Sequence, residues 1–185
     1  MQTYSLALAG TRSVLLTAVA ALPAALLTAL SAQIAVPLPW TPVPVTLQVF
    51  AVLAAAGLLG PRTSAVAQAE YLLMGLAGAP VFAGLRAGPA AILSPTGGYI
   101  LAFLPASVIC GALAQRRTLS AVLLGCACAA GVIHAGGLLW MHLTMGVPLE
   151  RAFALASAPF IAVDAAKVAA AAAVILTAKR AASPW

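Results

Sequence analysis

Long runs of apolar residues, broken by short segments that contain Pro, Gly or Arg, occupy almost all of this chain. A helix that crosses a bilayer needs about 20 mostly apolar residues, and 185 residues leave room for six such runs with short connections. Only 6% of the residues are charged, whereas soluble domains carry about 25%. Because backbone groups in lipid must be paired internally, and the sequence lacks the alternating pattern of a β-barrel, it predicts an all-α membrane protein.

We expect six transmembrane helices in a single domain that comprises residues 1–185. The expected spans are residues 13–36, 45–59, 63–79, 95–114, 119–145 and 152–178. The second and third runs are short for a span, so these helices are expected to be tilted or to begin in the interface. The chain length leaves no room for a soluble domain.

The basic residues predict the orientation of the chain in the membrane, since Arg and Lys collect on the cytoplasmic side. With the N-terminus inside, six basic residues face the cytoplasm: Arg12, Arg62, Arg116, Arg117, Lys179 and Arg180. Only Arg86 and Arg151 face outward. We therefore expect both termini in the cytoplasm, and we interpret the net charge of +6 as a topology signal rather than as a nucleic-acid-binding surface.

Two opposite charges, Asp164 and Lys167, interrupt the last apolar run. A charge at membrane depth costs about 2.5–3.5 kcal/mol on insertion scales, so such residues usually mark a substrate or ion path. Their i, i+3 spacing places both on one helix face, and we expect Asp164 about nine residues inside the last span. Two plainer alternatives are that the pair only neutralises itself, or that Lys167 pairs with Glu70.

The expected outer segments 37–46 and 80–98 are rich in Pro and Gly and too apolar to be ordinary solvated loops. We expect them to fold over the bundle and enclose a pocket. Phe82 is expected either to stack on a ligand ring or to pack against helices. At the start of the fourth span, glycines permit close backbone approach, free N–H groups suit an anion or a carbonyl, and Tyr99 adds a hydroxyl. A plain helix cap is the alternative there.

Small residues recur every four positions in the first span, at Ala21, Ala25 and Ala29. Such a groove admits another helix closely, and that helix can belong to a partner or to the same chain. His134 and His142 share a face of the fifth run without a third metal ligand, so a packing or interfacial role is expected. The sequence contains neither an ATP-binding P-loop nor the spacing of a Ser–His–Asp or zincin site.

Six motifs occur in a distinctive order along the chain. They are Val36–Gln48, Gly60-Pro61-Arg62, Tyr71–Gly75, Pro80–Gly84, Ser94–Tyr99 and Asp164-x-x-Lys167. Their order and spacing, over about residues 12–180, resemble the BioY family. That family comprises the biotin-specific substrate-binding (S) components of energy-coupling factor (ECF) transporters.

The resemblance implies six helices in a bacterial cytoplasmic membrane and capture of biotin from the outer side. It also implies docking on a transmembrane coupling protein that two cytoplasmic ATPases drive, with no cofactor or ATP site in this chain. A homo-oligomer is left open. Carried over residue by residue, it implies a biotin site comprising Asp164, Lys167, Tyr99, Gly98, Thr96, Phe82 and Gly84. It further implies a coupling-protein docking face at Ala21, Ala25 and Ala29.

The chain departs from the family pattern at several positions. Val163 and Ser94 stand where Gly is frequent, and Gly84-Leu85 replaces a frequent Gly-Gly or Asn-containing pair, which removes a possible ligand contact. Glu70 stands at a usually apolar position. Three alternatives are an S component for another small vitamin, an intramembrane enzyme that uses Asp164 as an acid or base, and a scaffold with a structural ion pair.

Overall fold

A computed structural model describes residues 2–182, with side chains described from residue 13 onward. Its elements, in chain order, are α1 (Gln2–Gln33), β1 (Ala35–Val36), β2 (Val45–Thr46), α2 (Gln48–Leu59), α3 (Pro61–Leu76), α4 (Pro89–Ile92), α5 (Gly97–Ala114), α6 (Leu119–Met145), α7 (Leu149–Ala156), η1 (Ala158–Phe160) and α8 (Ile161–Ala181). The two strands form an antiparallel ribbon in which Ala35 pairs with Thr46 and Val36 with Val45. This ribbon departs from the all-α prediction, because the chain on either side of the Pro-rich turn pairs with itself.

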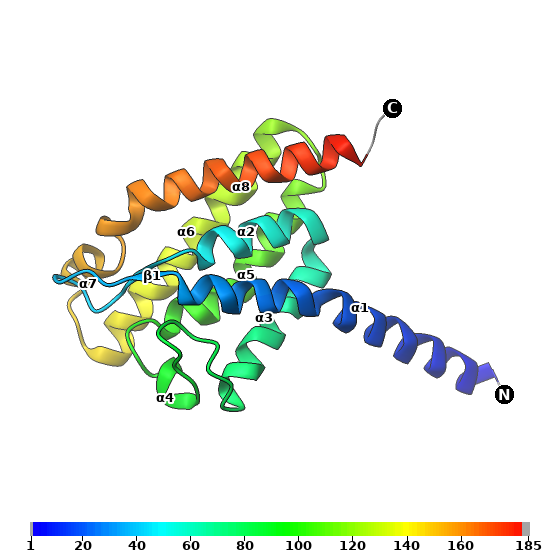
Figure 1. Cartoon of the computed structure of the whole chain (residues 1–185), viewed down its shortest axis with the longest axis horizontal. Helices are drawn as coiled ribbons and strands as arrows, with labels where there is room; N and C mark the ends of the chain where they lie inside the picture. Colours follow the sequence, from blue (N-terminus) through cyan, green and yellow to red (C-terminus); the bar gives the residue numbers. More distant parts are fainter. Residues whose placement is uncertain (1, 183–185) are drawn as a thin grey trace.

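The helices are arranged so that the chain enters and leaves at one end of the bundle. The first turns of α1 and the last turns of α8 lie at that end, whereas the β1–β2 ribbon, α4 and α7 gather at the other (Figure 1). We refer to the latter as the loop end. Opposite the loop end, Lys179 Nζ donates to the carbonyl of Ala114 at the end of α5, at 2.5 Å.

Four helical segments among residues 2–182 are long and apolar enough to cross a membrane, judged by length and composition. They are Ser13–Gln33, Gly97–Ala114, Leu119–Met145 and Leu149–Ala181. Of the shorter helices, α2 is apolar and has 12 residues, and α3 has 16. At 1.5 Å per residue α2 extends about 18 Å, against about 30 Å of hydrocarbon core. The membrane-protein prediction is therefore supported, while the six-span arrangement stays a prediction.

The structure corrects several expected helix boundaries. The first helix ends at Gln33 and the second begins at Gln48, because the residues next to them form the ribbon. The last apolar run is not one helix, since α7 and α8 are separated by the short turn η1, which contains Pro159. Asp164 consequently lies in the first turn of α8 rather than about nine residues inside a continuous span.

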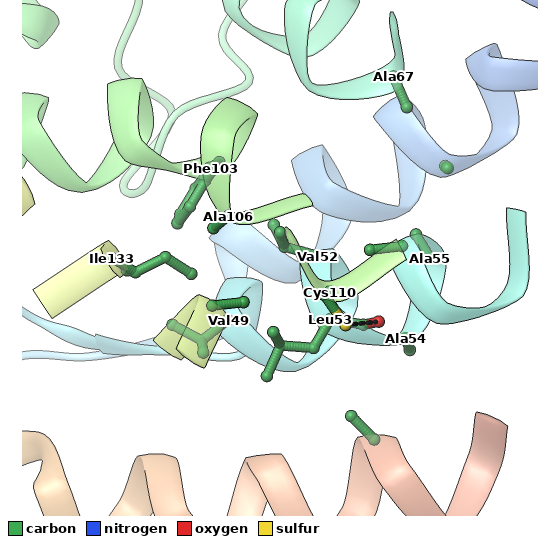
Figure 2. Close-up of a cluster of buried hydrophobic side chains, with 14 of the residues drawn as sticks. Val49, Val52, Leu53, Ala54, Ala55, Ala67, Phe103, Ala106, Cys110 and Ile133 are labelled. Atoms are coloured by element: carbon green, nitrogen blue, oxygen red, sulfur yellow. Dashed lines mark hydrogen bonds between the residues drawn. The ribbon is translucent and has the colours of Figure 1, made fainter. Parts of the chain in front are cut away.

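The core of the bundle surrounds α2. Nine of its twelve residues are buried, and it packs against α1, α3, α5, α6 and α8. Figure 2 shows this cluster, with labelled side chains that come from α2, α3, α5 and α6. Inside it, the thiol of Cys110 lies 3.5 Å from the carbonyl of Leu53. Many of the buried residues are alanines, which let helix backbones approach closely.

The alanine groove of α1 belongs to this core. Ala21 and Ala25 are 0% exposed and Ala29 is 8% exposed, because α1 packs against α3 and α2. These three alanines therefore pack within the chain, as the alternative expected, and a docking role for them stays a prediction. The opposite face of α1 exposes large apolar side chains such as Leu26 and Leu30.

We expect Ala25→Leu to lower the melting temperature of the purified protein in detergent, because overpacking a close helix contact costs about 1–3 kcal/mol. Ala20 is exposed on the same helix, so Ala20→Leu serves as the matched control and should leave the melting temperature unchanged. Equal melting temperatures for native protein and Ala25→Leu would contradict the packing described here.

Candidate functional site

A pocket lies at the loop end, where the ribbon, η1 and the first turns of α2, α5 and α8 meet. Its lining residues are Val43, Pro44, Val45, Thr46, Gln48, Val49, Ala83, Thr96, Tyr99, Ile100, Phe103, Phe160, Asp164 and Lys167. Its enclosed cavity is small, about 50 Å³, and it continues into an open region, so that the unfilled space counted together with its opening to solvent is about 540 Å³. The walls are mostly apolar, with a few polar groups that can orient a ligand.

Asp164 and Lys167 both lie on the pocket wall, as their helical spacing predicts. Lys167 Nζ lies 2.6 Å from Asp164 Oδ1, and the two side chains are only 11% and 8% exposed. The start of a helix favours a negative charge, which suits the position of Asp164 in the first turn of α8. Asp164 and Lys167 are thus paired with each other, as the first of the plainer alternatives expected. Both residues also line the pocket.

Glu70 is not the partner of Lys167, so the second plainer alternative is wrong. Lys167 pairs with the carboxylate three residues earlier, within its own helix. Among the described residues Glu70 forms no ion pair, and its Oε2 atom is buried without a hydrogen-bond partner.

His134 from α6 completes the surroundings of the carboxylate. Its Nε2 atom lies 3.1 Å from Asp164 Oδ2, so each carboxylate oxygen has one nitrogen partner. The sequence pointed only to a packing or interfacial role for His134, because nothing in the spacing of α6 relative to α8 shows which residues meet. The other expected histidine, His142, instead places Nδ1 2.8 Å from the carbonyl of Val147.

Tyr99 and Thr96 lie on the pocket wall at the start of α5, as predicted. The Tyr99 hydroxyl donates to the carbonyl of Ala156 and thereby ties α5 to the end of α7. Its ring lies against Gly137 of α6, where an added Cβ would come within 2.2 Å of the ring. Tyr99 therefore offers its ring to the pocket while its hydroxyl holds the wall together.

Three predicted ligand residues do not lie on the pocket wall. Phe82 is 0% exposed and packs edge-on against Tyr71, with ring centroids 5.4 Å apart. Gly84 is exposed in a left-handed turn with φ of +72°. Gly98 lies against the backbone of Gly136, where a side chain has no room. The structure gives Phe82 and Gly98 packing roles, and ligand contact by these three residues stays a prediction.

A second polar group on the pocket wall was not singled out from the sequence. Gln48, the first residue of α2, donates from Nε2 to the Tyr71 hydroxyl at 2.8 Å and accepts from Thr46 Oγ1 at 3.2 Å. The Tyr71 hydroxyl is 3.4 Å from the carbonyl of Val81. In the sequence, Gln48 and Thr46 stand out only as members of the Val36–Gln48 motif. The contact of Gln48 with Tyr71 depends on how α2 packs on α3, which the sequence does not show.

These side chains can bind a neutral polar group but do not form a metal site. Within the described residues, no group of three or more His, Cys, Asp and Glu side chains could hold a metal ion. A carboxylate accepts hydrogen bonds, and an ammonium group donates them. The pocket therefore suits a molecule whose apolar body carries a head with both N–H groups and a carbonyl.

Comparison with known protein families gives a match over nearly the whole chain. The sequence model of the BioY family matches residues 2–184. The chain belongs to the BioY family.

Two relatives are described as biotin transporters. A protein of Pyrococcus horikoshii, named probable biotin transporter BioY, is 42% identical over 143 residues, which cover 77% of this chain and 83% of the relative. The biotin transporter BioY of Thermotoga maritima is 34% identical over 144 residues, which cover 77% and 85%. The match thus extends over most of both chains.

A solved structure supports the fold. The crystal structure of the S component for biotin from an ECF-type ABC transporter superimposes with a TM-score of 0.82, covering 91% of this chain and 93% of that one at 21% identity. At this identity the likeness establishes the S-component fold.

We expect Lys167→Met to destabilise the protein by on the order of 3 kcal/mol, because a buried carboxylate loses its charged partner. The double variant Asp164→Asn/Lys167→Met removes both charges and should recover part of the loss. Arg180→Met, at an exposed position of the same helix, is the control. Thermal unfolding in detergent measures all four proteins, and a Lys167→Met variant as stable as the native protein would contradict the buried pair.

Proposed function

We propose that this chain captures biotin at the outer side of the membrane and delivers it to the cytoplasm as the S component of an ECF transporter. Membership of the BioY family makes the chain a transport protein and not an enzyme, so the alternative of an intramembrane enzyme is set aside. The observation that carries the proposal is the Asp164–Lys167 pair on the wall of a mostly apolar pocket at the loop end.

The chemistry of biotin fits the groups on this wall. Its ureido ring carries two N–H donors and one carbonyl acceptor, and its bicyclic body and chain are apolar. Asp164 accepts from the ureido N–H groups, and Lys167, which has three N–H donors, can serve both Asp164 and the carbonyl. Ile100, Phe103 and Phe160 supply apolar surface for the rest of the molecule.

In this proposal the loop end faces outward and both termini face the cytoplasm. The bias of basic residues toward the opposite end supports that orientation. The Pro-rich segment between β1 and β2 then covers the pocket from outside: it supplies Val43 and Pro44 to the pocket wall, and Thr41 Oγ1 donates to the carbonyl of Leu155 at 2.7 Å. Because this cover faces outward, release into the cytoplasm requires the subunit to reorient so that the opened pocket faces inward.

The proposed partners are a transmembrane coupling protein and two cytoplasmic ATPases. The alanines of α1 are covered within the chain, so docking at Ala21, Ala25 and Ala29 would require α1 to move away from α2 and α3. Labelled biotin uptake should be compared in cells that express this chain with and without a coupling module. Dependence of uptake on the module supports coupling, and equal uptake without it would contradict this part of the proposal.

We expect Asp164→Asn to weaken biotin binding by about ten-fold or more, equivalent to about 1.4 kcal/mol. The reason is that the Asn amide has one acceptor oxygen, whereas the Asp carboxylate has two. Glu150→Gln, which changes an acidic residue outside the pocket on α7, should leave the affinity unchanged. Isothermal titration of the purified protein measures both. Native affinity in Asp164→Asn, or tighter binding of a different vitamin by the native chain, would overturn the assignment of biotin to this pocket.

A further inference from the structure

Arg86 is exposed, and three hydrogen bonds hold its side chain beside the pocket. Its Nε donates to the carbonyl of Ala83 at 3.0 Å, Nη1 to Ser94 Oγ at 3.3 Å and Nη2 to Thr96 Oγ1 at 3.1 Å. Its own carbonyl accepts from the Phe82 N–H at 3.1 Å. Ala83 and Thr96 both line the pocket, so the guanidinium is hydrogen-bonded to two wall residues.

The charge of Arg86 has no acidic partner within the described residues. The ion pairs there involve Asp164 alone, and neither Glu70 nor Glu150 lies within pairing distance of an arginine. A guanidinium has five N–H groups, of which the protein acceptors use three. One N–H on each terminal nitrogen has no acceptor among the described residues, and either can donate a charge-assisted hydrogen bond to a carboxylate.

The pocket needs a second positive charge if its ligand is an anion. Asp164 and Lys167 neutralise each other, so a carboxylate bound in the pocket would otherwise lack a counter-charge. The start of α8 and the segment between α3 and α5, which carries Arg86, lie on opposite sides of the loop end (Figure 1). A ligand whose polar head contacts Asp164 can therefore extend its other end toward Thr96 and Arg86.

We infer that Arg86 binds the carboxylate of the ligand tail, so that the two ends of the pocket recognise the two polar ends of one molecule. This inference rests on the proposed function, because biotin carries a ureido head at one end and a carboxylate at the other. It assigns Arg86 to specificity for the acid over its uncharged derivatives. A role confined to supporting the loop predicts a different result, since support of the loop does not depend on the charge of the ligand.

The test compares two ligands against three proteins by isothermal titration. The ligands are biotin and biotinamide, which differ only in the charge at the tail. We expect the native protein to bind biotinamide about ten-fold more weakly than biotin. Arg86→Gln should bind biotin about ten-fold more weakly than the native protein does, while its affinity for biotinamide stays native. Arg151→Gln, an exposed arginine on α7, is the control and should match the native protein with both ligands.

Retained biotinamide affinity also shows that Arg86→Gln keeps a folded site. Equal losses for the two ligands would overturn the inference, because they would mean that Arg86 only supports the loop. Equal affinity of the native protein for both ligands would overturn it as well and would leave the proposed biotin function intact. Failure of the native protein to bind biotin at all would overturn the proposed function and this inference together.

Discussion

The carboxylate of Asp164 is the charge that the loop end has to accommodate. A charge in an apolar helix is costly, and here it is stabilised from two helices, by Lys167 at 2.6 Å and by His134 at 3.1 Å. The break between α7 and α8 adds a third contribution, because it places the carboxylate at the start of a helix, where the helix dipole favours it. These contacts fix the start of α8 against α6 and leave one side of the ion pair facing the pocket.

The rest of the bundle positions this pair relative to the other pocket residues. The alanine-rich packing around α2 brings the helix starts that carry Gln48, Tyr99 and Asp164 to the same end of the molecule. Close contacts between glycines and side chains, such as Gly137 with Tyr99, set the spacing between α5 and α6. A well-packed bundle thus ends in irregular segments that surround a pocket.

The amino-acid sequence predicts the apolar helices and the importance of Asp164 and Lys167, because hydropathy and a rare charged pair are local signals. It does not predict His134 as a partner of Asp164, since that contact depends on the packing of α6 against α8. It also leaves the α1 alanines open to two interpretations, because a groove of small residues fits a helix of the same chain as well as a partner. The break before α8 has a local cause, because Pro159 lies in the turn between α7 and α8. The expectation of one continuous span did not take this proline into account.

The central claim is that the pocket beside the Asp164–Lys167 pair is the biotin site. A crystal structure of the protein with bound biotin tests it most directly. The account predicts a ureido N–H within about 3 Å of an Asp164 carboxylate oxygen, with the bicyclic body against Phe103 and Phe160. Biotin bound elsewhere, or an Asp164 side chain turned toward lipid in the complex, would contradict it.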